Sequence, residues 1–155
     1  MRLALYQPDQ AGNVGTIIRL AACLGVPLDL IEPLGFPWGD RALKRAGMDY
    51  AELANVTRHA DWGAFEASLG GSAGLAGRLV LFTTAGGVRL PEARFESGDV
   101  LLFGSESGGV PEGVHERAEL RVRIPQVAGT RSLNLAVAVG IGVAEALRQA
   151  GHWSG

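Results

Sequence analysis

Cysteine and histidine are scarce in this sequence, whose 155 residues include one cysteine and three histidines. Cys23 has no partner for an internal disulfide, and its alanine and leucine neighbours predict a buried structural thiol in a cytoplasmic protein. His59, His115 and His152 are scattered along the chain and show no spacing typical of metal ligands. We therefore predict neither a disulfide nor a metal site.

Long apolar runs and a strong charge of one sign are also lacking. No apolar run reaches the roughly 18 residues of a membrane span, and the apolar start is broken too early for a signal peptide. Sixteen acidic and 14 basic residues give a net charge of -2, so nucleic-acid binding would need a local concentration of positive charge. The motifs of dinucleotide-binding folds, phosphate loops and serine hydrolases are missing.

The sequence does contain an alternation of apolar strands and amphipathic helices. Its 47% hydrophobic and 19% charged residues are typical of one compact domain, here residues 1–155. Strands are expected over 2–6, 27–31, 54–58, 78–84, 99–103 and 120–124, and helices over 13–25, 40–46, 62–69, 111–117 and 133–149. A Gly-rich loop is expected over 70–77. This alternation predicts an α/β fold with a mainly parallel sheet flanked by helices.

The first expected helix carries a polar amide and a cation within an apolar segment. Asn13 lies at its start, and Arg19 is flanked by Ile17 and Ile18. Gly15, between them, would allow another backbone to approach closely. A cation among apolar residues needs an anionic partner. Arg19 is therefore a candidate for binding a substrate anion, or for a structural ion pair with a nearby carboxylate.

A cluster of basic residues follows in the second expected helix. At helical spacing, Arg41, Lys44 and Arg45 share one face. Arg58 and His59 come shortly afterwards. The cluster is either an ordinary solvated helix face or the local positive charge that a phosphate backbone would require.

Two loops near the end of the chain could carry chemistry. In Phe-Gly-Ser-Glu-Ser-Gly-Gly, glycines would let backbone amides approach a ligand, and Glu106 would lie at the carboxyl end of a strand, where open α/β sheets bind ligands. After Ile124-Pro125, Ser132 is expected to cap the last helix, with Asn134 in its first turn. The alternatives are a tight turn with a solvated Glu106 and a capped core helix.

Three motifs occur in a fixed order: Asn-x-Gly-x-x-x-Arg, Gly-x-Glu-x-x-Gly, and Ile-Pro followed by Ser-Leu-Asn. This order and spacing resemble the SPOUT superfamily of RNA methyltransferases. The segments Leu-Tyr-Gln-Pro, Ile-Glu-Pro-Leu-Gly-Phe, Arg-Ala-Gly-Met-Asp-Tyr and Val-Thr-Arg-His further resemble the tRNA (cytidine/uridine-34)-2′-O-methyltransferase family. That family methylates the ribose 2′-OH of the wobble nucleotide, and the resemblance covers nearly the whole chain.

The resemblance implies a SPOUT fold with a deep trefoil knot in the C-terminal third. It also implies S-adenosyl-L-methionine as the cofactor and a homodimer whose active site lies at or near the subunit interface, formed by the first and last helices. By motif position, the cofactor pocket would include Phe82, Thr83, Thr84, Gly104, Gly109, Ile124, Ser132 and Leu133.

The same resemblance implies catalytic roles for four residues. Arg19 would be essential; because a guanidinium stays protonated, we expect it to bind the neighbouring phosphate and stabilise developing alkoxide charge. The proton would leave through that phosphate or through Glu106. Asn13 and Asn134 would position the substrate and loops. Contacts with the anticodon stem-loop of tRNA would come from Arg41, Lys44, Arg45, Arg58 and His59.

Three positions depart from the family pattern. Gly108 stands where an arginine is frequent, Ala136 where a serine is frequent, and Ala144 where a tyrosine is frequent. These departures affect cofactor contacts and dimer packing. Two alternatives stay open: a 2′-O-methyltransferase acting on another RNA such as ribosomal RNA, and a non-catalytic RNA- or nucleotide-binding module.

Overall fold

The computed structural model describes residues 1–51, 54–70 and 77–153. The loop expected over 70–77 therefore falls outside the described residues from 71 to 76. The elements in chain order are β1 (Arg2–Tyr6), α1 (Ala11–Leu24), β2 (Leu28–Ile31), α2 (Arg41–Ala46), η1 (Met48–Tyr50), β3 (Val56–His59), α3 (Trp62–Leu69), β4 (Leu79–Phe82), β5 (Val88–Arg89), η2 (Leu90–Glu92), β6 (Val100–Phe103), α4 (Glu112–Arg117), β7 (Leu120–Arg123) and α5 (Leu135–Ala150).

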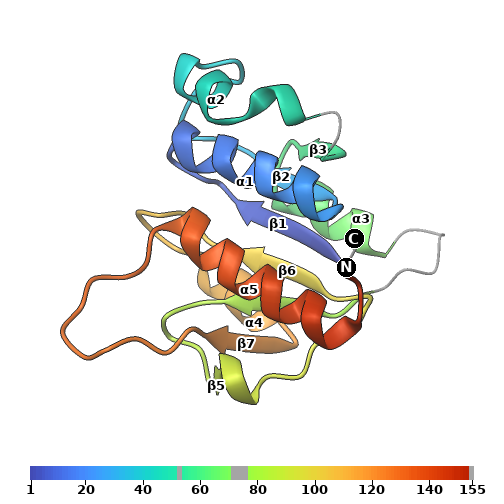
Figure 1. Cartoon of the computed structure of the whole chain (residues 1–155), viewed down its shortest axis with the longest axis vertical. Helices are drawn as coiled ribbons and strands as arrows, with labels where there is room; N and C mark the ends of the chain where they lie inside the picture. Colours follow the sequence, from blue (N-terminus) through green and yellow to red (C-terminus); the bar gives the residue numbers. More distant parts are fainter. Residues whose placement is uncertain (52–53, 71–76, 154–155) are drawn as a thin grey trace.

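Seven strands form one sheet in the order β3-β2-β1-β6-β4-β7-β5 (Figure 1). All of the strand pairs are parallel, so the predicted α/β fold with a parallel sheet is confirmed. The central pair, β1 and β6, joins distant parts of the chain, with Leu5 opposite Phe103. Because the strands are parallel, their carboxyl ends lie along one edge of the sheet, where ligands bind in open α/β folds.

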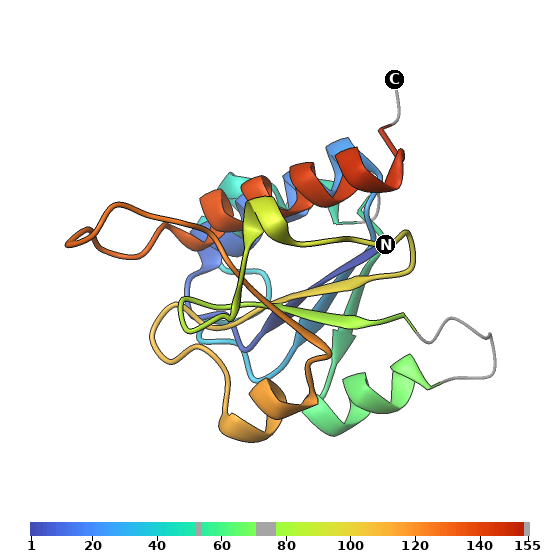
Figure 2. The same cartoon turned by 90° about the horizontal axis from the view of Figure 1, so that it is seen from below.

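Helices cover both faces of the sheet (Figure 2), with α1 and α5 on one face and α3 and α4 on the other. Side chains alternate along each strand accordingly. Leu3 and Leu5 of β1 point toward α1 and α5, whereas Ala4 and Tyr6 point toward α3 and α4. The central strands are buried on both faces, which explains their continuous apolar sequences.

Two helix ends follow the predicted local chemistry. Gly25 ends α1 in the left-handed conformation at φ 66°, and Asp61 caps α3 by accepting from the Ala64 N–H at 2.8 Å. Gly15 permits the expected close approach, because a Cβ there would lie 2.4 Å from the Ala46 Cβ. Helix α2 therefore packs directly against α1 and lies beside it (Figure 1).

Two details differ from the sequence-based expectation. The prediction that Cys23 is buried is wrong: it is exposed, since it lies on the face of α1 that points away from the sheet. The short elements β5 and η2, over Val88–Glu92, were not expected, because a strand of two residues is too short to show a period of its own. Among the described residues, no helix is long and apolar enough to cross a membrane.

Candidate active site

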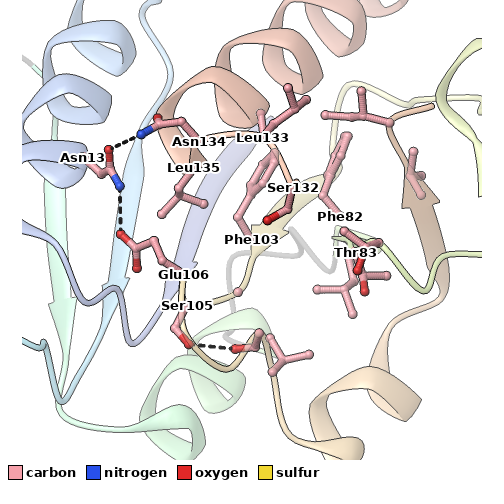
Figure 3. A pocket seen from close by; sticks show the side chains of 18 of the residues that line it. Asn13, Phe82, Thr83, Phe103, Ser105, Glu106, Ser132, Leu133, Asn134 and Leu135 are labelled. Carbon is pink, nitrogen blue, oxygen red and sulfur yellow. Dashed lines mark hydrogen bonds between the residues drawn. The ribbon is translucent and has the colours of Figure 1, made fainter. Parts of the chain in front are cut away.

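A cavity of about 360 Å³ opens at the carboxyl ends of β4, β6 and β7 (Figure 3). Its volume is in the range of small-molecule binding sites. It is walled by the start of α1, by the loops that follow these three strands, and by the residues that lead into α5. Every residue predicted for a cofactor pocket lines it: Phe82, Thr83, Thr84, Gly104, Gly109, Ile124, Ser132 and Leu133.

The loop that follows β6 is a closed turn made of backbone. The Ser105 N–H donates to the Gly109 carbonyl at 3.0 Å, and the Gly109 N–H donates to the Ser105 carbonyl at 2.9 Å. A Cβ at Gly104 would lie 2.6 Å from the Gly109 carbonyl carbon, so only glycine fits there. The missing side chains leave the backbone of this turn open to the cavity, as the glycine pattern predicted.

One chain of hydrogen bonds joins residues from all three motifs (Figure 3). The Asn134 Nδ2 donates to the Asn13 Oδ1 at 2.9 Å, and the Asn13 Nδ2 donates to the Glu106 Oε1 at 3.1 Å. The other carboxylate oxygen of Glu106 accepts from the Asp9 N–H at 2.7 Å. Thus Asn13, Glu106 and Asn134 lie together at the cavity wall, and each holds its neighbour in one orientation.

Asn134 has a second role as the N-cap of α5. Its Oδ1 accepts from the Ala136 N–H at 2.9 Å and from the Val137 N–H at 3.3 Å. The prediction that Ser132 caps this helix is therefore wrong by two residues. Both Ser and Asn are good caps, and the pattern does not distinguish them; the side chain nearer the first free N–H groups takes the role. Ser132 instead lines the cavity.

Asp9 is a site residue that the sequence reasoning missed. Its Oδ2 accepts from both the backbone N–H and the hydroxyl of Ser107, at 2.9 and 2.5 Å. The only signal in the sequence was an aspartate after a proline in a turn, which is a common surface pattern. Together with the contact from the Asp9 N–H to Glu106, these bonds tie the loop before α1 to the loop after β6.

Arg19 does not line the cavity of its own chain. Its position is about 120° around the axis of α1 from Asn13. The side chain is exposed, and its Cζ lies 5.5 Å from the centre of the Tyr50 ring. No carboxylate in the described part of the chain forms an ion pair with Arg19. A structural ion pair, the alternative that the sequence left open, is therefore not seen there.

The basic residues predicted to bind RNA separate into two environments. Arg41, Lys44 and Arg45 are exposed on α2, and Arg58 is exposed on the edge strand β3. His59 is different: it is 9% exposed, and its Nε2 lies 2.7 Å from the Oδ1 of buried Asp29. The prediction of a direct RNA contact is wrong for His59, because strand alternation turns its ring toward α3, away from solvent.

The fold and the cavity define an α/β protein with a cavity of small-ligand size at the carboxyl edge of a parallel sheet. Residues 1–144 match the family described as SpoU rRNA methylase. The chain belongs to this family of methyltransferases.

Individual relatives extend the comparison. Proteins named tRNA (cytidine(34)-2′-O)-methyltransferase are 50% identical in Ancylobacter novellus, over 99% of this chain and 96% of the relative, and 42% identical in Escherichia coli K12, over 98% and 95%. A solved structure concerned with the 2-OH methylation of C/U34 on tRNA matches with a TM-score of 0.87 and 47% identity, over 96% of this chain and 94% of that chain. An AdoMet-bound rRNA methyltransferase from Sinorhizobium meliloti matches at a TM-score of 0.80 and 32% identity, over 95% of this chain and 55% of its own.

Proposed function

We propose that this protein transfers a methyl group from S-adenosyl-L-methionine to the ribose 2′-OH of nucleotide 34 of tRNA, a cytidine or modified uridine. The observation that carries the proposal is the hydrogen-bonded chain from Asn134 through Asn13 to Glu106 at one cavity. Relatives that are 40–50% identical over almost the whole chain and are named for this reaction support it.

The cavity suits the proposed cofactor. Phe82 and Phe103 stack with ring centres 4.5 Å apart and, with Leu133, give the cavity an apolar wall that suits an adenine ring. Thr83 and the backbone of the turn after β6 add polar groups that suit a ribose or an amino-acid moiety. When bound, S-adenosyl-L-methionine supplies an activated methyl group on a sulfonium centre.

The proposed roles of Arg19 and Glu106 follow from their chemistry and contacts. A guanidinium that stays protonated can bind the phosphate next to the target ribose and stabilise negative charge that develops on the 2′-oxygen. Glu106 already accepts from two donors with its two oxygens, which favours a positioning role. The proton of the 2′-OH is therefore assigned to the neighbouring phosphate.

A homodimer is part of the proposal, since Arg19 does not line the cavity of its own chain. Val137 and Ile141 are 50% and 38% exposed on one face of α5, beside α1. An apolar helix face of this kind is typical of a subunit interface. Pairing of the α1–α5 faces would bring Arg19 from one subunit toward the cavity of the other.

Four further features belong to the proposal. The C-terminal third is threaded as a deep trefoil knot, and residues 1–155 form one domain. The support is the membership of the SpoU family and the insertion of β6 between β1 and β4. The site of action is the cytoplasm, and the anticodon stem-loop is bound through exposed basic residues: Arg41, Lys44, Arg45 and Arg58.

Ribosomal RNA is the second candidate substrate, because a relative in Sinorhizobium meliloti is described as an rRNA methyltransferase. The tRNA substrate is favoured because this chain spans 55% of that relative but 96% of the Ancylobacter novellus tRNA methyltransferase. The test is to incubate the protein with labelled S-adenosyl-L-methionine and unmodified tRNA, and to map the product by nuclease digestion and mass spectrometry. Methylation of a base, or no transfer to any tRNA, would disprove the proposal.

A further inference from the structure

The Arg58 guanidinium is fixed as a flat surface on the edge strand β3. Its Cζ lies over the Trp38 ring, 4.8 Å from the ring centre, which is a cation–π contact. Its Nε donates to the Glu32 Oε1 at 3.1 Å, and its Nη2 donates to the same oxygen. The side chain is nevertheless 41% exposed. With the indole beneath it and Glu32 along one edge, the open part of the group is its outer face.

The Trp38–Arg58 pair and the cavity both lie toward the carboxyl ends of the strands. Glu32 follows β2 directly, and the loop from Glu32 to Trp38 packs on the loop that follows β1. The Gly35 N–H donates to the Pro8 carbonyl at 3.0 Å, and a Cβ at Gly35 would lie 2.7 Å from the Asp9 Cα. Asp9 in turn binds Glu106, so the Trp38–Arg58 pair is connected to the cavity wall through two loops in direct contact.

The chemistry of the pair differs from that of the basic face of α2. Glu32 offsets the charge of Arg58, which weakens it as a phosphate ligand. A planar cation held on an aromatic ring is instead a surface on which an unpaired base can stack, and proteins that read single-stranded RNA loops use such surfaces. Arg45 on α2 is an exposed cation suited to phosphate.

We propose that the outer face of Arg58, backed by Trp38 and held by Glu32, is a stacking platform for an unpaired base of the RNA loop that carries the target nucleotide. This inference rests on the proposed function, because it takes the RNA substrate from it. It assigns Arg58 to binding a base, whereas the charge pattern alone would assign it to a phosphate.

Substitution by lysine separates the two assignments, because lysine keeps the charge and removes the plane. Binding of a fluorescently labelled anticodon stem-loop would be measured for Arg58→Lys and Arg58→Ala, with Arg45→Lys and Arg45→Ala as matched controls. We expect both Arg58 variants to weaken binding about 10-fold, as for loss of one stacked base. Arg45→Lys should weaken binding less than Arg45→Ala, because the lysine keeps the charge that a phosphate contact needs. In methyl transfer, the Arg58 variants should raise KM for RNA and leave kcat near the wild-type value.

A second arm replaces single loop nucleotides by abasic ones. If the missing base is the one that stacks on Arg58, the abasic RNA should bind the wild type, Arg58→Lys and Arg58→Ala with equal affinity. A double-mutant cycle over protein variant and abasic position measures this coupling. Wild-type binding by Arg58→Lys, or a defect that no abasic position removes, overturns the inference. If Arg58→Lys does not fold, Arg58→Gln takes its place with the opposite expectation: it loses the charge and keeps a flat end group, so it should bind the RNA more tightly than Arg58→Ala, and equal binding by these two variants overturns the inference. The wild-type transfer assay tests the proposed function separately, since active wild type with unaffected Arg58 variants refutes the platform alone.

Discussion

Asp9 and Glu106 each bind the backbone of the other's loop. The Asp9 N–H donates to the Glu106 Oε2 at 2.7 Å, and the Asp9 Oδ2 accepts from the N–H of Ser107, the residue after Glu106, at 2.9 Å. This reciprocal contact fixes the turn after β6 against the start of α1. The position of Glu106, and through it that of Asn13, depends on a residue that does not itself line the cavity.

The first prediction concerns Glu106→Gln. The glutamine can offer one oxygen acceptor where the carboxylate offers two, so either the Asp9 N–H or the Asn13 amide loses its partner. Loss of a hydrogen bond to a charged group costs about 1.5–3 kcal/mol, so we expect single-turnover methyl transfer to fall roughly 10- to 100-fold. Asp9→Asn should give a smaller defect of the same kind. Wild-type rates for both variants would contradict the positioning role.

Two substitutions of Asn134 separate its role as the N-cap of α5 from its hydrogen bond to Asn13. Asn134→Asp keeps an oxygen for the Ala136 and Val137 N–H groups but loses the donor to Asn13, whereas Asn134→Ala loses both. We expect Asn134→Ala to lower the free energy of unfolding by about 1 kcal/mol and Asn134→Asp to leave it unchanged. Both should impair methyl transfer. Urea denaturation and transfer assays measure the two effects, and a stable, fully active Asn134→Asp would refute the link to Asn13.

Arg19→Ala should abolish methyl transfer and leave cofactor binding intact, because Arg19 is exposed and does not line the cavity of its chain. Isothermal titration with S-adenosyl-L-methionine measures the second part. If the active site is shared between subunits, mixing Arg19→Ala with Glu106→Gln should restore part of the activity in mixed dimers. Loss of cofactor binding in Arg19→Ala would instead place Arg19 in the cofactor pocket.

Gly142 on α5 should not tolerate a side chain. A Cβ there would lie 2.8 Å from two carbons of the Phe82 ring and 3.1 Å from Phe103. We expect Gly142→Ala to lower the free energy of unfolding by about 1–3 kcal/mol and to weaken cofactor binding, since Phe82 lines the cavity. Gly113→Ala is the control, because nothing lies within 4 Å of its Cβ position on α4. It should leave stability unchanged or raise it by about 0.5–1 kcal/mol.

The pH dependence of stability should include a contribution from Glu145. Hydrogen bonds from Arg148 and Gln149 lower the pKa of Glu145 from 4.5 to about 2. A lowered pKa in the folded state stabilises the protein above the unfolded pKa, and this stabilisation is lost as the pH falls from 4.5 toward 2. Glu145→Gln should therefore be less stable than the wild type at pH 7, by a small amount because the pair is at the surface. The difference in urea midpoint should shrink steadily as the solution is acidified below the unfolded pKa.

The sequence predicted the parallel sheet, because the alternation of apolar strands and helices is a local signal; it was the resemblance to the SPOUT superfamily that placed Asn13, Glu106 and Asn134 in one site. The contacts within the site could not be predicted in this way. Whether Ser132 or Asn134 caps α5 depends on the path of the chain before Leu135, and both residue types serve equally well as caps. The role of Asp9 depends on Ser107, which is distant in the sequence and near in space only after folding.

Exposure was the other quantity that the sequence could not determine. His59 and Arg58 are adjacent in a basic-looking segment, yet strand alternation buries the histidine against Asp29 and exposes the arginine beside Trp38. Cys23 has apolar neighbours but lies on the outer face of α1. In each case the side of the element that faces the core was decided by the elements packed against it.

The hydrogen bonds at the cavity also bear on how the chain folds. Asn13 reaches Glu106 across 93 residues of sequence and Asn134 across 121 residues. Closing such long loops costs entropy before any contact is gained, and chains dominated by distant contacts fold slowly. The cavity is therefore completed only when β6, inserted between β1 and β4, and the last helix have both docked. During synthesis the cavity therefore cannot be complete until the residues that lead into α5 have left the ribosome and docked.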